Sequence, residues 1–366
     1  MTHSFLRTVT TALCGITLAS SAAAINPGFP YGSQKVRGVN LGGWLVLEPW
    51  ITPSLFEQTG NNDIIDEWTF GQLQDRGTAT NRLRQHWDTW ITEQDFRDIA
   101  AAGLNHVRIP IGYWAFQVQG GEPYIQGQLP YLQRAVGWAA ANNLKVIVDL
   151  HGAPGSQNGF DNSGQKKDFP GWHSDSNNVR RTNDVIKQIA DLFKDNTNVV
   201  PIIAPLNEPA GFYGDDVLSV TRQLWQHSEN RRSDQEHINV ACNYANEVST
   251  FDLWTIIGEW TPAATDCAKY LNGRGVGSRY DGSYPGSSRI GSCQGKTGSA
   301  SSFSNDYKNF LRQYWEAQVI TYEKGEGWIQ WTWKAENADE WSYQAGLRNG
   351  WIPQNPSERR FPGICG

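Results

Sequence analysis

The run IIAPLNEP at residues 202–209 constrains the fold more than any other stretch of this sequence. Its apolar part is short and bounded by prolines, which favours a buried parallel strand over a helix. Because the residue before a proline is pushed to extended backbone, Glu208 cannot begin a regular helix. The run therefore predicts a strand that delivers a carboxylic acid to the mouth of an α/β barrel. A solvated acid in an ordinary strand-to-helix loop is the alternative.

Short apolar strands alternate with helices along the first half of the chain. This alternation implies a parallel sheet, and the polar residues at the strand ends imply the mouth of a (β/α)8 TIM barrel. Thr92 with Asp95 predicts the N-cap of a helix that ends near Gly103. The predicted strands cover 36–40, 105–110, 145–150, 202–206, 254–260 and 327–334, and the further helices cover 129–142, 179–194, 215–226 and 305–323.

The N-terminus and the cysteines predict secretion. Residues 1–24 have a positive start, a weakly apolar stretch and an Ala-x-Ala site, as in a signal peptide. We expect residues 25–366 to form one catalytic domain. Four cysteines remain in it, and they predict two disulfides with three possible pairings. No basic cluster accompanies the net charge of −6, and no other stretch could span a bilayer, which argues against nucleic acid and membrane partners.

Glu208 and Glu259 each follow a predicted strand, and such a pair suits glycoside hydrolysis. Retaining enzymes need two carboxyls about 5–5.5 Å apart, one as nucleophile and one as acid and then base. Glu208 would be protonated at rest and Glu259 ionised. The 17 Trp, 13 Tyr and 14 Phe on a polar, Gly-rich chain are typical of sugar-stacking surfaces, although rings can also be core. This chemistry needs no cofactor, and no cluster has metal-ligand spacing.

Several longer motifs resemble glycoside hydrolase family 5, and more narrowly its fungal secreted exo-β-1,3-glucanases. The resemblance runs from about residue 36 to 365. The motifs are 37–44 (RGVNLGGW), 151–159 (HGAPGSQNG), 206–209 (LNEP), 258–260 (GEW), 265–269 (TDCAK) and 331–334 (WTWK).

The resemblance implies a barrel enzyme that removes glucose from non-reducing ends of β-1,3-glucan, in cell-wall glucan turnover and with transglycosylation as a side activity. Glu208 would be the acid/base, Glu259 the nucleophile and Asn207 the partner of the sugar 2-hydroxyl. Glu48, Arg108 and His151 would hold the first glucose or orient the nucleophile, above a floor formed by Trp331. Phe160 and Asp161 would lie at the entrance to the next subsites. The family's disulfides imply the pairs Cys242–Cys365 and Cys267–Cys293, and we expect a monomer.

Each of these residues also has a purely structural interpretation. Arg108 could form a structural ion pair, and His151 could be a satisfied core histidine. The remaining alternatives are plain packing for Trp331, a turn cap for Glu48 and loop filling for Phe160.

One interval departs from the family pattern. Glu208 and Glu259 stand only 51 positions apart (208 to 259). Three strand–helix units of a barrel need roughly 90 residues. This interval therefore contains no candidates for strands five and six. The family's His-x-Tyr pattern is also missing from it. We infer a missing segment joined between about residues 225 and 233, as a mispredicted exon boundary would leave; a genuine short form is the alternative.

This gap leaves three functional hypotheses. The first is the secreted exo-β-1,3-glucanase, located outside the cell or in the wall. The second is another family-5 activity, such as an endo-β-1,4- or β-1,6-glucanase, which would release oligomers. The third is an inactive, truncated glucan-binding protein, because an opened barrel would not guarantee the spacing of the two carboxylates.

Overall fold

Five parallel strands form the centre of the computed structural model, which describes residues 26–214 and 233–366. Their spatial order is β4-β3-β2-β1-β5. The first four predicted strands and the last are therefore confirmed, the last ending earlier than expected. The strands are β1 Val36–Asn40, β2 His106–Gly112, β3 Lys145–Gly152, β4 Ile202–Ala204 and β5 Gly327–Gln330.

The segment 254–260 lies beside β5, on the edge that β1 does not occupy. It forms one parallel bridge, between Ile257 and Trp328, instead of the regular strand that the sequence predicts. Backbone hydrogen bonds extend this contact, from Glu326 N to Thr255 O at 2.9 Å and from Ile329 N to Ile257 O at 2.8 Å. Within residues 26–214 and 233–366, no strand pairs with the outer edge of this segment. A ladder bonded on one side only is weakly ordered, which explains the irregular backbone.

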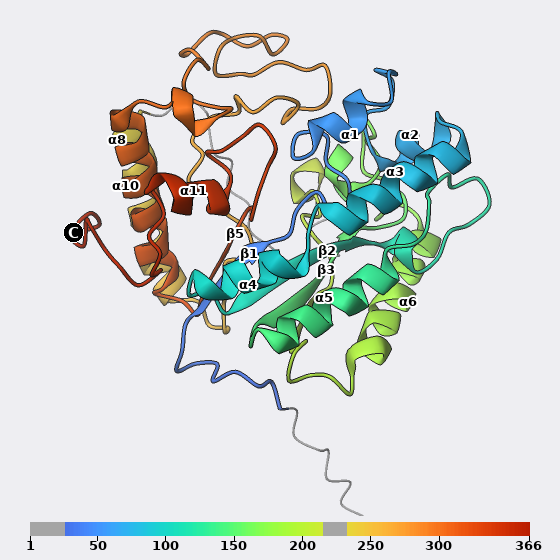
Figure 1. The fold of residues 1–366 in the computed structure, drawn as a ribbon, viewed down its shortest axis with the longest axis horizontal. Helices are drawn as coiled ribbons and strands as arrows, with labels where there is room; N and C mark the ends of the chain where they lie inside the picture. Colours follow the sequence, from blue (N-terminus) through green and yellow to red (C-terminus); the bar gives the residue numbers. More distant parts are fainter. Residues whose placement is uncertain (1–25, 215–232) are drawn as a thin grey trace, which may run out of the picture.

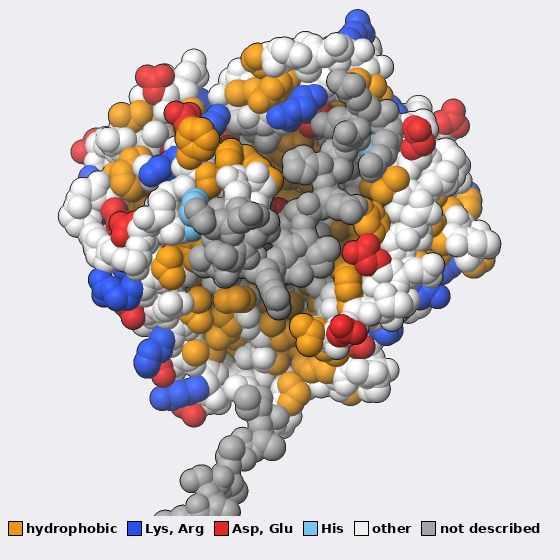
Figure 2. Space-filling view, turned by 180° about the vertical axis from the view of Figure 1, so that it is seen from behind, with side chains coloured by type: hydrophobic (Ala, Val, Ile, Leu, Met, Phe, Trp, Pro, Cys, Tyr) orange, Lys and Arg blue, Asp and Glu red, His pale blue; other side chains and the backbone are white. Residues whose placement is uncertain are grey.

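The two edges of the sheet are the places where strands five and six of a barrel would lie. The residues of β4 are partly exposed, whereas every residue of β2 and β3 is buried. Leu253 is 80% exposed and Trp254 48% exposed at the other edge. Figure 2 shows hydrophobic side chains gathered around the middle of the rear face. The described chain thus has six of eight barrel positions, in agreement with the predicted loss of strands five and six.

Helices cover the outside of the sheet. Figure 1 shows α3, α5 and α6 on one side of the strands and α8, α10 and α11 on the other. No helix in the described part of the chain is long and apolar enough to cross a membrane. The predicted helix 215–226 and the predicted signal peptide lie outside the described residues. The helices are α1 Pro53–Glu57, α2 Glu67–Gln72, α3 Arg76–Thr89, α4 Glu93–Ala101, α5 Leu129–Ala141, α6 Ser176–Phe193, α8 Asp234–Asn243, α9 Ala245–Ser249, α10 Asn305–Tyr322 and α11 Tyr343–Asn349.

Local sequence explains where these helices begin. The predicted cap of α4 is confirmed as a capping box, in which Thr92 N and Oγ1 lie 2.8 and 3.0 Å from Asp95 Oδ2. Such a box satisfies backbone donors that the first helical turn leaves free. The stretch 57–90 contains the two helices α2 and α3. Their N-caps are Asp66 and Asp75, each of which accepts a backbone N–H three residues on.

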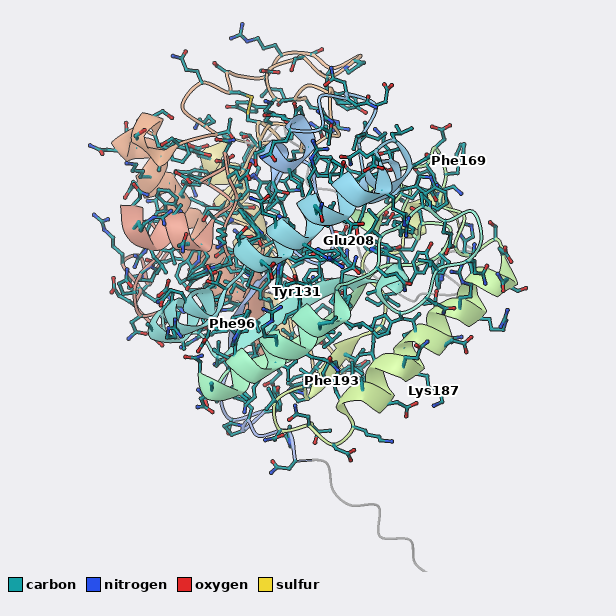
Figure 3. The ribbon with its side chains drawn as sticks, turned by 45° about the vertical axis from the view of Figure 1, so that its right-hand side comes forward. Phe96, Tyr131, Phe169, Lys187, Phe193 and Glu208 are labelled. Atoms are coloured by element: carbon teal, nitrogen blue, oxygen red, sulfur yellow. A yellow bond between two sulfur atoms is a disulfide. The ribbon has the colours of Figure 1, made fainter. Side chains whose placement is uncertain are left out.

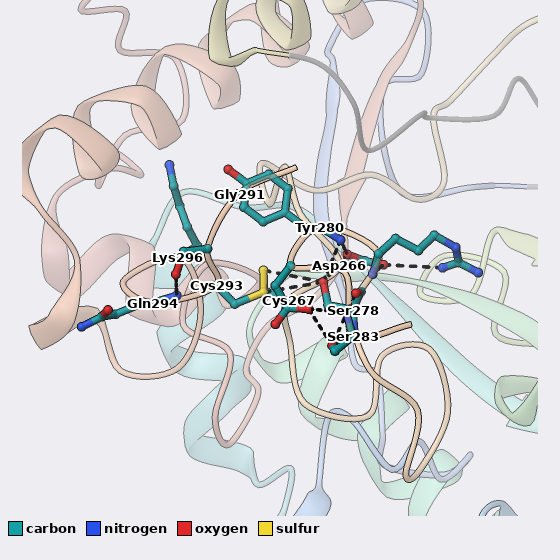
Figure 4. The surroundings of a disulfide bond; sticks show 12 residues. Asp266, Cys267, Ser278, Tyr280, Ser283, Gly291, Cys293, Gln294 and Lys296 are labelled. Carbon is teal, nitrogen blue, oxygen red and sulfur yellow. Dashed lines mark hydrogen bonds and ion pairs between the residues drawn. A yellow bond between two sulfur atoms is a disulfide. The ribbon is translucent and has the colours of Figure 1, made fainter. Parts of the chain in front are cut away.

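The two disulfides are the pairs expected from the resemblance, Cys242–Cys365 and Cys267–Cys293. The first ties α8 to the C-terminus. The second closes the loop between α9 and α10 (Figure 4). Within that loop the Asp266 carboxylate accepts hydrogen bonds from Ser278 Oγ at 2.6 Å and from Tyr280 N at 3.0 Å. The loop is therefore held by polar bonds as well as by sulfur.

Candidate active site

Polar side chains from four strand positions meet at the carboxyl edge of the sheet. Arg108 comes from β2 and His151 from β3, while Asn207 and Glu208 follow β4. Glu259 lies near the end of the segment 254–260 beside β5. Because parallel strands all end at the same edge, residues far apart in sequence come together there. The structure therefore brings together the predicted centre of the site.

Arg108 connects the residues expected on either side of the reaction centre. Its Nη1 donates to Glu259 Oε2 at 3.1 Å, and its Nη2 donates to Asn207 Oδ1 at 2.7 Å. Nη1 also donates to Asn40 Oδ1 at 2.8 Å. The side chain of Arg108 is only 7% exposed. A planar guanidinium fork is suited to hold several oxygens at fixed angles, so these groups share one rigid support.

Glu208 occupies a restricted position after β4. Its backbone has a φ of 42°, in the left-handed region that favours glycine, so the extended backbone expected for the residue before Pro209 is wrong. Asn162 Nδ2 donates to Glu208 Oε2 at 3.3 Å. Figure 3 shows Glu208 near the centre of the molecule, with Phe169 nearer its periphery. Unusual backbone angles of this kind cluster at functional sites, in keeping with the catalytic interpretation.

Glu208 and Arg108 have opposite effects on the protonation of Glu259. Burial, and then the charge of Glu208, raise the pKa of Glu259 to about 8, while the charge of Arg108 opposes this rise. Burial thus favours a protonated Glu259, whereas the nucleophile role requires the carboxylate. The hydrogen bond from Arg108 Nη1 favours that carboxylate. The expected resting state, with Glu259 ionised, stays a prediction.

Two further predicted residues are the buried Glu48 and the half-buried Asp161. Each has a buried oxygen without a hydrogen-bond partner within the described residues, Glu48 Oε1 and Asp161 Oδ2. Glu48 Oε2 accepts from Trp50 Nε1 at 3.0 Å. Burial, with the charges of Glu259 and Asp161, raises the pKa of Glu48 well above its usual range. Burial raises the pKa of Asp161 to about 7. Buried oxygens without partners are suited to accept the hydroxyls of a polar ligand.

Trp331 and His151 stack in parallel, with ring centroids 5.4 Å apart and planes 13° from parallel. Trp331 is 4% exposed and belongs to a small cluster with Trp50, Ile51 and Ala268. Much of its surface is thus used in packing, as the structural alternative supposed. Its role as a sugar floor stays a prediction.

Phe160 is 44% exposed at the side of the site and stacks against Phe212, with centroids 6.3 Å apart. The sequence reasoning did not single out Phe212, Tyr213 or Phe169, which continue this exposed aromatic group. Their only sequence signal is the placement of rings in polar, Gly-containing loops. The role of Phe160 at the entrance to the next subsites stays a prediction.

Sequence reasoning also missed two buried polar residues. Asn40 ends β1 and is 0% exposed, and its Nδ2 donates to Gly258 O at 3.2 Å, next to Glu259. Asp149, also 0% exposed, lies between Arg108 and His151. Both are polar residues near the ends of apolar strands, which is the signal that could have identified them.

Comparisons with known proteins place the chain among fungal glucosidases. Residues 71–248 match the family described as Cellulase (glycosyl hydrolase family 5). The chain is 42% identical to a glucan 1,3-beta-glucosidase of Blumeria graminis, over 97% of this chain and 95% of that relative. It is 41% identical to a probable glucan 1,3-beta-glucosidase A of Emericella nidulans, over 95% of this chain and 97% of that relative. A rutinosidase from Aspergillus niger superimposes with a TM-score of 0.65 at 16% identity, covering 88% of this chain and 99% of that one, which supports the TIM-barrel fold.

The alignment with the Blumeria relative also bears on the short interval. It runs over 408 positions, whereas this chain has 366 residues. At least 42 positions (408 less 366) therefore have no counterpart here. Two strands with their connections need roughly that length, in agreement with the two unpaired edges of the sheet.

Proposed function

The chain belongs to glycosyl hydrolase family 5, and we propose that it is a secreted glucan 1,3-β-glucosidase. It removes glucose from the non-reducing ends of β-1,3-glucan and retains the anomeric configuration. One observation carries this assignment: Arg108 holds Asn207 on one side and Glu259 on the other, with Glu208 adjacent to Asn207. This arrangement joins a sugar-binding amide to both carboxyls that retention requires.

In the first step the Glu259 carboxylate attacks the anomeric carbon while Glu208 gives its proton to the glycosidic oxygen. The bond between that carbon and oxygen breaks, and the shortened glucan leaves with the new hydroxyl. In the second step a water molecule gives a proton to Glu208, and the oxygen of that water attacks the anomeric carbon. The bond between this carbon and Glu259 breaks, which frees the Glu259 carboxylate and β-glucose. Asn207 would donate to the 2-hydroxyl, an interaction that strengthens in the transition state.

Secretion is part of the proposal. The predicted signal peptide supports it, and so do the two disulfides, which form in oxidising compartments. Cell-wall glucan is then the accessible substrate. Its terminal glucose would occupy the region lined by Glu48, with Asp161 at the entrance to the next subsites. Transglycosylation, in which a sugar hydroxyl replaces water in the second step, belongs to the same mechanism.

The test is hydrolysis of laminarin by the secreted chain, followed by proton NMR of the first product. We expect free glucose that appears first as the β-anomer. Oligomers would instead indicate an endo-acting enzyme, and α-glucose would exclude retention. Glu208→Ala should lose activity on laminarin, and azide should rescue cleavage of an activated aryl β-glucoside as β-glucosyl azide. Glu259→Ala should not be rescued with that configuration.

A second candidate is a non-catalytic glucan-binding protein. The unpaired edges of β4 and of segment 254–260 favour it, because an open sheet holds Glu208 and Glu259 less rigidly. Retention of the chain on insoluble β-1,3-glucan without release of sugar would support this candidate and contradict the enzymatic one.

A further inference from the structure

Asp149 is a fully buried carboxylate in β3 that the proposed reaction does not use directly. It stands in register with Pro110 of β2 and Ala204 of β4, so it lies inside the sheet. Burial of a charge is costly unless the charge is paired. Its partners therefore indicate why this position carries an acid.

Both partners of Asp149 belong to the candidate site. Arg108 Nη2 lies 2.9 Å from Asp149 Oδ1 as an ion pair. His151 Nδ1 lies 2.6 Å from Asp149 Oδ2. One carboxylate thus fixes the guanidinium that reaches Glu259 and the imidazole that stacks on Trp331.

The contact with His151 sets the position of its proton. A carboxylate only accepts hydrogen bonds, so Nδ1 of the ring carries the hydrogen. In the neutral ring, Nε2 is then an acceptor. Asn207 Nδ2 lies 3.4 Å from that Nε2 and is the donor.

The same logic fixes the amide of Asn207. Arg108 only donates, so the amide atom 2.7 Å from its Nη2 must be the oxygen. The amide nitrogen then faces His151, and it carries a second hydrogen that can be offered to a sugar hydroxyl. The orientation of Asn207 therefore depends on two side chains that are both anchored to Asp149.

We propose that Asp149 is a positioning residue: through His151 and Arg108 it holds the Asn207 amide so that an N–H is presented to the 2-hydroxyl of the sugar. This inference rests on the proposed glucosidase function and adds a residue to it. In other enzymes a carboxylate that accepts from Nδ1–H of a histidine holds the ring in one tautomer and orientation.

Asp149 also affects the charge balance around Glu259. Among the described residues, the charged groups that act on Glu259 include Arg108 from β2, Asp149 from β3 and Glu208 after β4. Glu259 in turn acts on Glu48, which also faces Asp161 from the loop after β3, and His151 contacts Asp149. The negative charge of Asp149 raises the pKa of Glu259, so its removal should lower that pKa. The pH profile of activity should then move to lower pH.

The experiment compares Asp149→Asn, Asn207→Ala and the double variant on an aryl β-glucoside and on its 2-deoxy analogue. We expect Asp149→Asn to lower kcat/KM on the glucoside about 100-fold, as displacement of a positioned group does. The loss on the 2-deoxy analogue should be only a few-fold, because that substrate lacks the hydroxyl. The double variant should be no worse than Asn207→Ala alone.

Glu316→Gln is the matched control. Glu316 is a buried acid on α10 paired with Arg312, and it accepts from Phe361 N at 2.6 Å outside the site. The Glu316→Gln substitution should leave kcat/KM on both substrates and the pH profile unchanged.

Three results would overturn the inference. The first is an Asp149→Asn variant that keeps full kcat/KM, as Glu316→Gln should. The others are equal losses of kcat/KM on both substrates in Asp149→Asn, and losses from the two single substitutions that multiply in the double variant. Inactivity of the unaltered chain on every substrate would overturn the glucosidase assignment and this inference with it. If Asp149→Asn does not fold, nitrogen-15 NMR of the unaltered protein decides. The neutral His151 ring should carry its proton on Nδ1, and a proton on Nε2 would contradict the proposal.

Discussion

Replacement of Arg108 by lysine is the sharpest test of the site, because it keeps the charge and removes the fork. The guanidinium donates to Asn40 at 2.8 Å, to Asn207 at 2.7 Å and to Glu259 at 3.1 Å. A single ammonium on a differently shaped stem cannot reach all three oxygens. We expect two of the three hydrogen bonds to be lost, each worth roughly 1.5 kcal/mol because the donor is charged.

We therefore expect Arg108→Lys to lower the free energy of unfolding by about 3 kcal/mol, which corresponds to several degrees in Tm. Activity should fall further, by at least about 100-fold in kcat/KM, because Asn207 and Glu259 lose their common support. Thermal unfolding and initial rates on an aryl β-glucoside measure the two effects separately.

Arg181→Lys provides the control for stability. Arg181 is a buried arginine on α6 whose Nη1 and Nη2 donate to Glu122 at 2.8 and 2.9 Å, and neither residue is one of the predicted site residues. Its replacement should cost comparable stability and leave kcat/KM unchanged. If both variants lose activity alike, or if Arg108→Lys keeps full activity, the argument that Arg108 organises the site is wrong.

Four other outcomes are expected. A full-length transcript sequenced between the codons for Glu208 and Glu259 should encode at least 42 further residues, the number by which the 408-position alignment exceeds this chain. These residues should include two apolar strands and a His-x-Tyr pattern. A transcript that matches this sequence would contradict the missing-segment explanation. Activity should peak at acidic pH, because the proposed reaction needs a protonated acid and an ionised nucleophile at the same time; a maximum in kcat/KM above neutral pH would contradict this. Burial lowers the pKa of His86 to about 4 and that of His106 to about 3, from about 6.5 in the unfolded chain. The stability that these neutral rings contribute is therefore complete above pH 6.5 and is lost as pH falls toward these values, by about 3 kcal/mol for His86 alone. The free energy of unfolding at pH 7 and at pH 4 measures this loss, and equal values would refute it. Phe160→Ala should raise KM for laminarin several-fold and leave the aryl glucoside unaffected, and equal effects on both would exclude a contact surface for sugar rings.

Much of the fold could be predicted from local sequence. The apolar runs that form β1 to β4 are short and bounded by turn residues, and the pair Thr92 and Asp95 specifies a helix cap within four residues. Such signals depend on neighbours along the chain, so a single sequence contains them. The same reasoning placed Glu208 and Glu259 at strand ends and identified an interval too short for three strand–helix units.

Only the tertiary structure could decide how those strand ends share their contacts. Asp149 and Asn40 look like ordinary polar residues in sequence, and their importance comes from Arg108, which reaches partners on four different strand positions. Segment 254–260 looks like a strand, yet it has a neighbour on one side only and forms a single bridge. Hydrogen bonds between separate strands depend on register and on which edges are occupied, and neither is written in any local run of residues.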